Sequence, residues 1–116
     1  MAGEVERTAR LNDSRTAEAI WQALPIEGRA NRWGDEIYFA ISLELEPEDG
    51  RDVLEEGELG YWPPGTALCV FWGRTPASQG DEIRAASPVN VFGRVEDDPA
   101  GFGAVRSGER VRIEAV

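Results

Sequence analysis

Apolar residues recur at helical spacing in only one segment of the chain. Within residues 15–24, the positions i, i+3, i+4 and i+7 are Ala17, Ile20, Trp21 and Leu24, which would share one face of a helix. Asp13 or Ser14 can cap the start of this helix, and Pro25 ends it because proline cannot continue the hydrogen-bond ladder. The pattern predicts a short helix over residues 15–24 that buries its apolar face, including Trp21.

Strict alternation of apolar and polar residues follows in residues 36–46. One face of the expected strand carries Ile37, Phe39, Ile41, Leu43 and Leu45, and the other carries Glu36, Tyr38, Ser42, Glu44 and Glu46. Proline disrupts strand pairing, so we expect the strand to end at Pro47. The segment predicts one long, half-buried strand.

Three more segments are expected to be extended. Residues 67–72 are apolar at every position, which is typical of a strand covered on both faces. Residues 85–95 and 110–116 alternate, with Val89 and Val91 opposite Asn90 and Phe92 in the first of these. Glycine and proline turns separate the segments. The order favours an all-β, mostly antiparallel barrel or sandwich with one or two short helices.

A rigid corner precedes the apolar strand, in the sequence GYWPPGTALCVFWGRTP at residues 60–76. Pro63 and Pro64 restrict the backbone, and Gly65 permits the turn that follows. We therefore expect Tyr61 and Trp62 to be held in place. Fixed aromatic rings form good apolar binding walls because they offer a large area at a small entropic cost. The segment predicts a binding pocket.

Composition excludes several classes of function. The 116 residues form one domain over residues 1–116, and the net charge of −10 argues against a nucleic-acid partner. The chain has no histidine and no lysine, and Cys69 is its single cysteine, so Ser-His triads, lysine Schiff bases and internal disulfides are excluded. We expect no metal and no cofactor. Apolar runs are too short for an export signal or a membrane span, which indicates a cytoplasmic protein with no membrane partner.

Several motifs together resemble those of a known family. They are Asn31 with WGDEIYF at residues 33–39, GYWPPG and ALCVFWG with a following TP within residues 60–76, and ASPVNVFGR at residues 86–94. With the IWQALP segment of the expected helix, they resemble the small prokaryotic proteins of cyclophilin-like fold, most of which have no assigned function. The resemblance covers nearly the whole chain from about Leu11. It implies a closed β-barrel of about eight strands.

The chain departs from this family at its start. Members generally carry an additional N-terminal strand before the one that matches Arg7 to Leu11, and here only a few residues precede it. A barrel that lacks a strand exposes unpaired backbone groups, which invite pairing with another chain. A homodimer is therefore as well supported as a monomer. A subunit of a larger assembly, joined through an open barrel edge, is a further alternative.

The function that the sequence favours is a binding module for a small molecule or a proline-containing peptide, with an aromatic-lined groove. Apolar contacts would come from Trp33, Tyr61, Trp62, Phe71 and Trp72, and polar groups of the ligand would be oriented by Glu36, Ser87 and Asn90. A buried Glu36 could also act as an acid or base, although satisfaction by backbone amides or an arginine is the alternative. Cys69 is expected to be a small buried apolar side chain.

The alternative function is peptidyl-prolyl cis-trans isomerisation. In active cyclophilins an arginine within FHR and QGGDF-type patterns acts near the prolyl nitrogen, and neither pattern occurs in this chain. The arginines near the matching blocks are Arg32, Arg74, Arg84 and Arg94. No catalytic residue is identified, and whether the protein is an enzyme stays open.

Overall fold

The helical stripe forms α1 (Arg15–Ala23) in the computed structural model, which describes residues 1–116. The side chain of Ser14 accepts the backbone N–H of Ala17 and caps the helix, and Pro25 follows its end. The buried face of α1 consists of Thr16, Ala17 and Ile20. Trp21 lies beside this face and is 54% exposed, so the prediction of a buried Trp21 is wrong. None of the helices is long and apolar enough to span a membrane.

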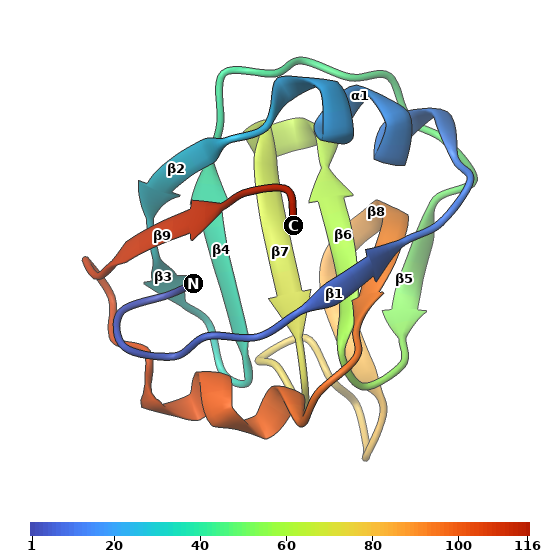
Figure 1. Cartoon of the computed structure of the whole chain (residues 1–116). Coiled ribbons are helices and arrows are strands. Elements are labelled where there is room, and N and C mark those ends of the chain that lie inside the picture. Colours follow the sequence, from blue (N-terminus) through green and yellow to red (C-terminus); the bar gives the residue numbers. More distant parts are fainter.

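Nine strands make up most of the remaining secondary structure, and every named pair is antiparallel (Figure 1). Seven of them form the main sheet in the order β1-β8-β6-β7-β4-β3, and β5 pairs with β8. Their bounds are β1 (Ala9–Leu11), β3 (Asn31–Arg32), β4 (Glu36–Ala40), β5 (Arg51–Leu54), β6 (Glu58–Trp62), β7 (Ala67–Phe71) and β8 (Ile83–Val95). The prediction of an all-β, mostly antiparallel fold is confirmed.

A second, smaller sheet pairs β2 (Ile26–Arg29) with β9 (Arg110–Ile113). It lies in front of β4 in Figure 1, while α1 covers the top of the molecule. Two short 3-10 helices complete the chain: η1 (Pro63–Gly65) forms the Pro-Pro-Gly corner, and η2 (Pro99–Ala104) lies along the bottom of Figure 1.

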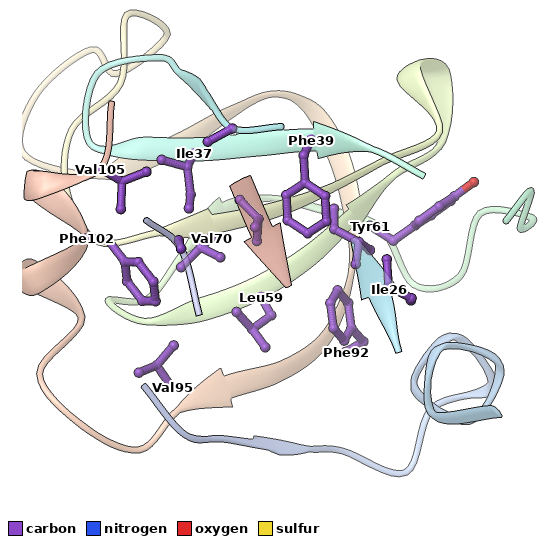
Figure 2. Packing of buried hydrophobic residues seen from close by; sticks show 14 of the residues in the cluster. Ile26, Ile37, Phe39, Leu59, Tyr61, Val70, Phe92, Val95, Phe102 and Val105 are labelled. Atoms are coloured by element: carbon purple, nitrogen blue, oxygen red, sulfur yellow. The ribbon is translucent and has the colours of Figure 1, made fainter. Parts of the chain in front are cut away.

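The main core lies between the two sheets (Figure 2). Alternate residues of the central strands point into it, because successive side chains of a strand face opposite ways. Its large side chains include Ile26, Ile37, Phe39, Leu59, Tyr61, Val70, Phe92 and Phe102. The core positions of β4, Ile37 and Phe39, are those that the alternating pattern predicts, whereas β8 sends both Phe92 and Val95 into the main core because its register is irregular.

The two sheets do not close into a barrel. No ladder joins β3 to β1, the two ends of the main sheet, and β2 with β9 stays a separate pair. The chain passes from β2 to β3 through Ala30, whose N–H donates to the carbonyl of Glu109 over 2.8 Å. The smaller sheet therefore lies against the main sheet without continuing its ladder. The closed barrel that the family resemblance implies is not confirmed.

Residues 41–50 keep the predicted alternation but have no partner strand. The hydroxyl of Tyr61 donates to the carbonyl of Leu43 and accepts the N–H of Leu45, both over 3.0 Å. Side-chain hydrogen bonds thus hold this segment, and Leu43 and Leu45 pack against the main core. The single long strand that the sequence predicts over residues 36–46 ends at Ala40, where β4 ends.

The N-terminal residues extend the edge of β9. Ala2 forms a bridge with Val111, the N–H of Gly3 donates to Arg110, and the N–H of Arg112 donates to Met1. These bonds cover an edge that would otherwise expose backbone groups. The expectation of a homodimer concerns a second copy of the chain and stays a prediction.

β8 is long enough for its two halves to pair with different strands. Its first half pairs with β5, and its second half pairs with β6 and β1, with a register irregularity opposite Leu59 and Gly60. The first half therefore lies against the outer face of the main sheet, where a second apolar cluster contains Leu54, Cys69, Phe71, Ala85 and Val89. This cluster surrounds the candidate site.

Candidate functional site

A cavity of about 210 Å³ lies on the outer face of the main sheet. It is bounded by β4, β6 and β7 on one side and by the first half of β8 on the other. Eight of its nine lining residues are apolar or aromatic, and the ninth is a carboxylic acid. The lining residues are Trp33, Glu36, Tyr38, Trp62, Cys69, Phe71, Ala85, Ala86 and Val89. We call this site the outer-face cavity.

The alternation of β7 places one set of side chains in the main core and the other in the cavity. Leu68 and Val70 belong to the main core, whereas Cys69 and Phe71 belong to the outer cluster. Gly60, the neighbour of Cys69 on β6, leaves room for this packing. A Cβ at Gly60 would lie 2.7 Å from the side chain of Val89 and 3.4 Å from the ring of Phe71. A larger residue there would displace the cavity walls.

Trp62 is fixed by two neighbours. Its indole Nε1 donates to the hydroxyl of Ser87 over 2.7 Å. A Cβ at Gly65 would lie 2.6 Å from the indole ring, so the glycine of the Pro-Pro-Gly corner permits close packing of this ring. Thr66, and not Gly65, adopts the left-handed backbone conformation of the turn, with φ of 48°. The corner therefore positions Trp62, as the sequence predicts.

The turn between β3 and β4 brings Trp33 beside Glu36. The N–H of Trp33 donates to the carbonyl of Glu36 over 3.0 Å, and the N–H of Asp35 donates to the carbonyl of Arg74 over 2.8 Å. Gly34, at φ of 65°, takes the left-handed conformation that glycine adopts at little cost. Backbone bonds thus hold the turn, and both side chains line the cavity.

Glu36 is the one charged residue that lines the cavity. Its side chain is buried, with the residue 4% exposed, and its Oε1 has no hydrogen-bond partner. Burial raises the pKa of Glu36 to about 7, and the nearby Cys69 thiol opposes this rise. Near neutral pH the carboxyl group therefore exists in both its charged and its neutral form.

Cys69 faces Glu36 from the adjacent strand β7. Burial raises the pKa of the Cys69 thiol well above its usual value, and the charge of Glu36 adds to the rise. The thiol therefore stays protonated near neutral pH, and a protonated thiol is a poor nucleophile. Cys69 acts as a small apolar wall of the cavity, in accord with the sequence-based expectation.

Four of the eight site residues that the sequence suggests come together in the cavity: Trp33, Glu36, Trp62 and Phe71. Ser87 does not line the cavity but accepts the hydrogen bond of Trp62. Tyr61 and Trp72 point into the main core instead. The reason is the strand alternation, because Tyr61 precedes Trp62, and Trp72 follows Phe71, so the members of each pair face opposite ways.

Asn90 also lies away from the cavity, in a buried polar network. Its side-chain N–H groups donate to Thr16 Oγ1 and to the carbonyl of Glu46, over 3.0 and 2.9 Å, and its Oδ1 accepts the N–H of Glu48 over 2.8 Å. The carboxylate of Glu48 in turn accepts the first N–H groups of α1, from Arg15 and Thr16. The expectation that Asn90 orients a ligand in the groove does not hold, since its polar atoms already join α1 to residues 41–50.

Five lining residues were not expected from the sequence: Tyr38, Cys69, Ala85, Ala86 and Val89. The alternating pattern places Tyr38 on the same face as Glu36, and Cys69 lies two positions before Phe71, so both could have been found. The three residues of β8 could not have been found from the sequence, because they reach the cavity only where β8 folds across the main sheet.

The four arginines considered for isomerisation do not line the cavity. Arg32 donates to the carbonyls of Gly34, Gly103 and Val105, and its guanidinium lies 5.2 Å from the ring centre of Trp72. Arg84 pairs with Glu82 and Asp52, Arg94 pairs with Glu55, and Arg74 is exposed. No three His, Cys, Asp or Glu side chains form a group that could hold a metal ion.

The fold and the cavity define a small antiparallel β protein with a mostly apolar cavity on the outer face of its main sheet. The chain belongs to the cyclophilin-like family, whose model matches residues 1–114. It is also similar to a hypothetical protein from Archaeoglobus fulgidus with a known solution structure, at 44% sequence identity and a TM-score of 0.83, over 98% of this chain and 90% of that one. No curated protein matches the chain. The family resemblance identified from the motifs is confirmed.

Proposed function

We propose that this protein is a small-molecule binding module and that the outer-face cavity is its binding site. The observation that carries the proposal is a preformed apolar cavity with one buried polar group, which is the usual composition of ligand sites. An apolar cavity of ~150 Å³ accommodates benzene. At about 210 Å³, this one has room for a single ring with a short substituent.

The rigidity of the walls supports binding. Trp62 is held by Ser87 and packs against Gly65, and the backbone bonds of the β3–β4 turn hold Trp33. Walls that are ordered before the ligand arrives lose little entropy on binding. Burial of a phenyl-sized group contributes about 2–3 kcal/mol, which by itself supports only weak binding. A polar contact at Glu36 would supply both additional affinity and orientation.

Binding is favoured over prolyl isomerisation because none of the four candidate arginines lines the cavity. A small molecule is favoured over an extended peptide because the space suits one ring, which a peptide could fill only with a single side chain. The cavity would then act as a specificity pocket, and the rest of the peptide would need a further surface.

Titration with benzyl alcohol, followed by the amide chemical shifts of residues around the cavity, tests the proposal. Ala86 is exposed and lines the cavity, so Ala86→Phe should fill the cavity without disturbing the core. Ala100→Phe is the matched control, because Ala100 is exposed on η2 and does not line the cavity. We expect saturable shifts at the lining residues in the native protein and in Ala100→Phe, and at least fivefold weaker binding in Ala86→Phe. Absence of saturable shifts at the lining residues, or equal binding by both variants, contradicts the proposal.

A further inference from the structure

The outer-face cavity contains an acceptor that nothing in the protein satisfies. Oε1 of Glu36 is buried without a hydrogen-bond partner, although buried carboxylates in folded proteins are normally bonded. Leaving a charged group unpaired in an apolar site is costly. A ligand that donates a hydrogen bond to Oε1 would remove this cost, so the cavity is best matched by a donor.

The groups that face Glu36 offer no compensating positive charge. β7 contributes the Cys69 thiol, β4 contributes the Tyr38 phenol, and the first half of β8 contributes only Ala85, Ala86 and Val89. The remaining walls are aromatic rings from Trp33, Trp62 and Phe71. The lining therefore supplies no counter-ion for the charged form of this carboxyl group, and a bound ligand could supply one.

We infer that the outer-face cavity binds a small organic cation, in which one apolar ring carries a protonated amine or amidine whose N–H group donates to Oε1 of Glu36. This inference rests on the proposed binding function and specifies its ligand. A charge-assisted hydrogen bond of this kind is roughly twice as strong as one between neutral groups.

The walls and the overall charge favour a cation over other ligands. Aromatic faces attract cations through the ring quadrupole. Four of the nine lining residues are aromatic, namely Trp33, Tyr38, Trp62 and Phe71. The net charge of −10 raises the local concentration of cations and repels anions. An anionic ligand would in addition meet Glu36 with no cationic side chain in the lining to offset the repulsion.

Three ring compounds of similar size test the inference: benzylamine, benzyl alcohol and benzoate. They are titrated at about pH 8, where a primary amine with a pKa near 10 stays protonated. Benzylamine should bind at least fivefold more tightly than benzyl alcohol, and benzoate should bind most weakly. Glu36→Gln keeps the shape of the side chain and removes its charge, so it should abolish the preference for benzylamine while benzyl alcohol still binds. Nα-acetyl-lysine amide, which presents an amine without a ring, should bind more weakly than benzylamine.

Asp35→Asn is the matched control. Asp35 precedes Glu36, its side chain is 51% exposed, and it does not line the cavity. Asp35→Asn changes the net charge of the protein by the same amount as Glu36→Gln. Because Asp35 does not line the cavity, the preference for benzylamine should survive in this variant. An equal loss of the preference in both variants would assign it to long-range attraction and overturn the inference.

The pH dependence gives a second readout. Because the ammonium group pairs with the carboxylate, benzylamine affinity should rise about tenfold between about pH 6 and about pH 8 in the native protein, and it should be flat in Glu36→Gln. The inference is overturned if benzylamine binds less than fivefold more tightly than benzyl alcohol, or if this preference survives in Glu36→Gln. It is also overturned if the affinity for benzylamine does not rise with pH, or if benzoate or the lysine derivative binds more tightly than benzylamine. If benzyl alcohol binds in these cases, the proposed function stands and only the ligand class is wrong; if no compound binds, both fail.

Discussion

The indole Nε1 of Trp62 donates a hydrogen bond to the Oγ of Ser87 over 2.7 Å and thereby joins β6 to the first half of β8. These two strands form opposite walls of the outer-face cavity. The bond spans 25 positions of sequence and connects an aromatic wall to the strand that folds across it. Ser87 is thus a positioning residue, which acts on a ligand through Trp62.

Ser87→Ala should loosen this wall. Loss of one hydrogen bond lowers the free energy of unfolding by about 1 kcal/mol. Since a mobile Trp62 must be ordered again on binding, benzyl alcohol should bind about threefold to tenfold more weakly. Chemical denaturation and the titration described above measure the two effects. Ser42→Ala, at an exposed serine outside the cavity, is the control, and a Ser87→Ala protein that matches it in both measurements would show that the bond does not order the wall.

Glu36→Gln should stabilise the protein in a pH-dependent way. The pKa of Glu36 is about 7 in the folded protein and 4.5 in the reference state, so the folded form binds the proton more tightly. The stabilisation that this tighter proton binding gives the folded protein is complete below about pH 4.5 and is lost as the pH rises to about 7. The loss amounts to about 3 kcal/mol, since one pKa unit corresponds to ~1.4 kcal/mol. Glutamine carries no charge, so the variant avoids this loss.

Denaturation curves of both proteins at about pH 4.5 and about pH 8 measure the effect. At the lower pH the two free energies of unfolding should be similar, because Glu36 is then mostly protonated in the folded protein. At the higher pH the variant should be more stable by up to about 3 kcal/mol. Other groups titrate in both proteins and cancel in the difference. A difference that does not change with pH would mean that the carboxyl group has a normal pKa.

Asn90→Ala should detach residues 41–50 from α1. The amide makes three hydrogen bonds, to Thr16, Glu46 and Glu48, and the residue is 1% exposed. Its removal leaves buried partners unsatisfied, which costs about 2–4 kcal/mol of the free energy of unfolding. Faster hydrogen exchange of the Glu48 amide would locate the change. Asn31→Ala, at an exposed asparagine, should cost less than about 1 kcal/mol, and a similar cost for both variants would contradict the role of the network.

The sequence predicts the local elements of this fold well because each rests on a short-range pattern. α1 begins after Ser14, whose oxygen satisfies a free N–H group, and β7 covers the apolar run because its two faces enter two different clusters. Residues 41–46 differ, because a strand also needs a partner. Tyr61 and Asn90 are distant in sequence from this segment but form hydrogen bonds with it, and no local pattern encodes such contacts.

The candidate site is half predictable for a similar reason. Trp33 and Trp62 lie at strand ends beside glycine or proline, and this local signal places them correctly at the cavity. The sequence also suggests Tyr61 and Trp72 there because they are aromatic, although strand alternation sends them to the face opposite Trp62 and Phe71. The β8 wall depends on a 13-residue strand that changes partners along its length, which requires the three-dimensional structure.

Truncation of two tryptophans of the chain should change its stability to very different extents. Trp72 is 8% exposed, and its ring lies 6.0 Å from that of Phe102 and below the guanidinium of Arg32. Trp72→Ala leaves a large hole in the main core and should lower the free energy of unfolding by about 3–5 kcal/mol. Trp21 has more than half of its surface in solvent. Trp21→Ala should therefore change stability by no more than about 0.5 kcal/mol.

Chemical denaturation of the two variants distinguishes core packing from surface exposure at each ring. Quenching of fluorescence by iodide gives an independent readout, because an anion in solution reaches Trp21 but not Trp72. Removal of Trp21 should therefore lower the quenchable fraction of the emission, whereas removal of Trp72 should raise it, provided that the measurement is made where the variant is still folded. A Trp21→Ala protein that loses several kcal/mol would instead mean that α1 buries this ring against the sheet, as the helical stripe in the sequence predicts.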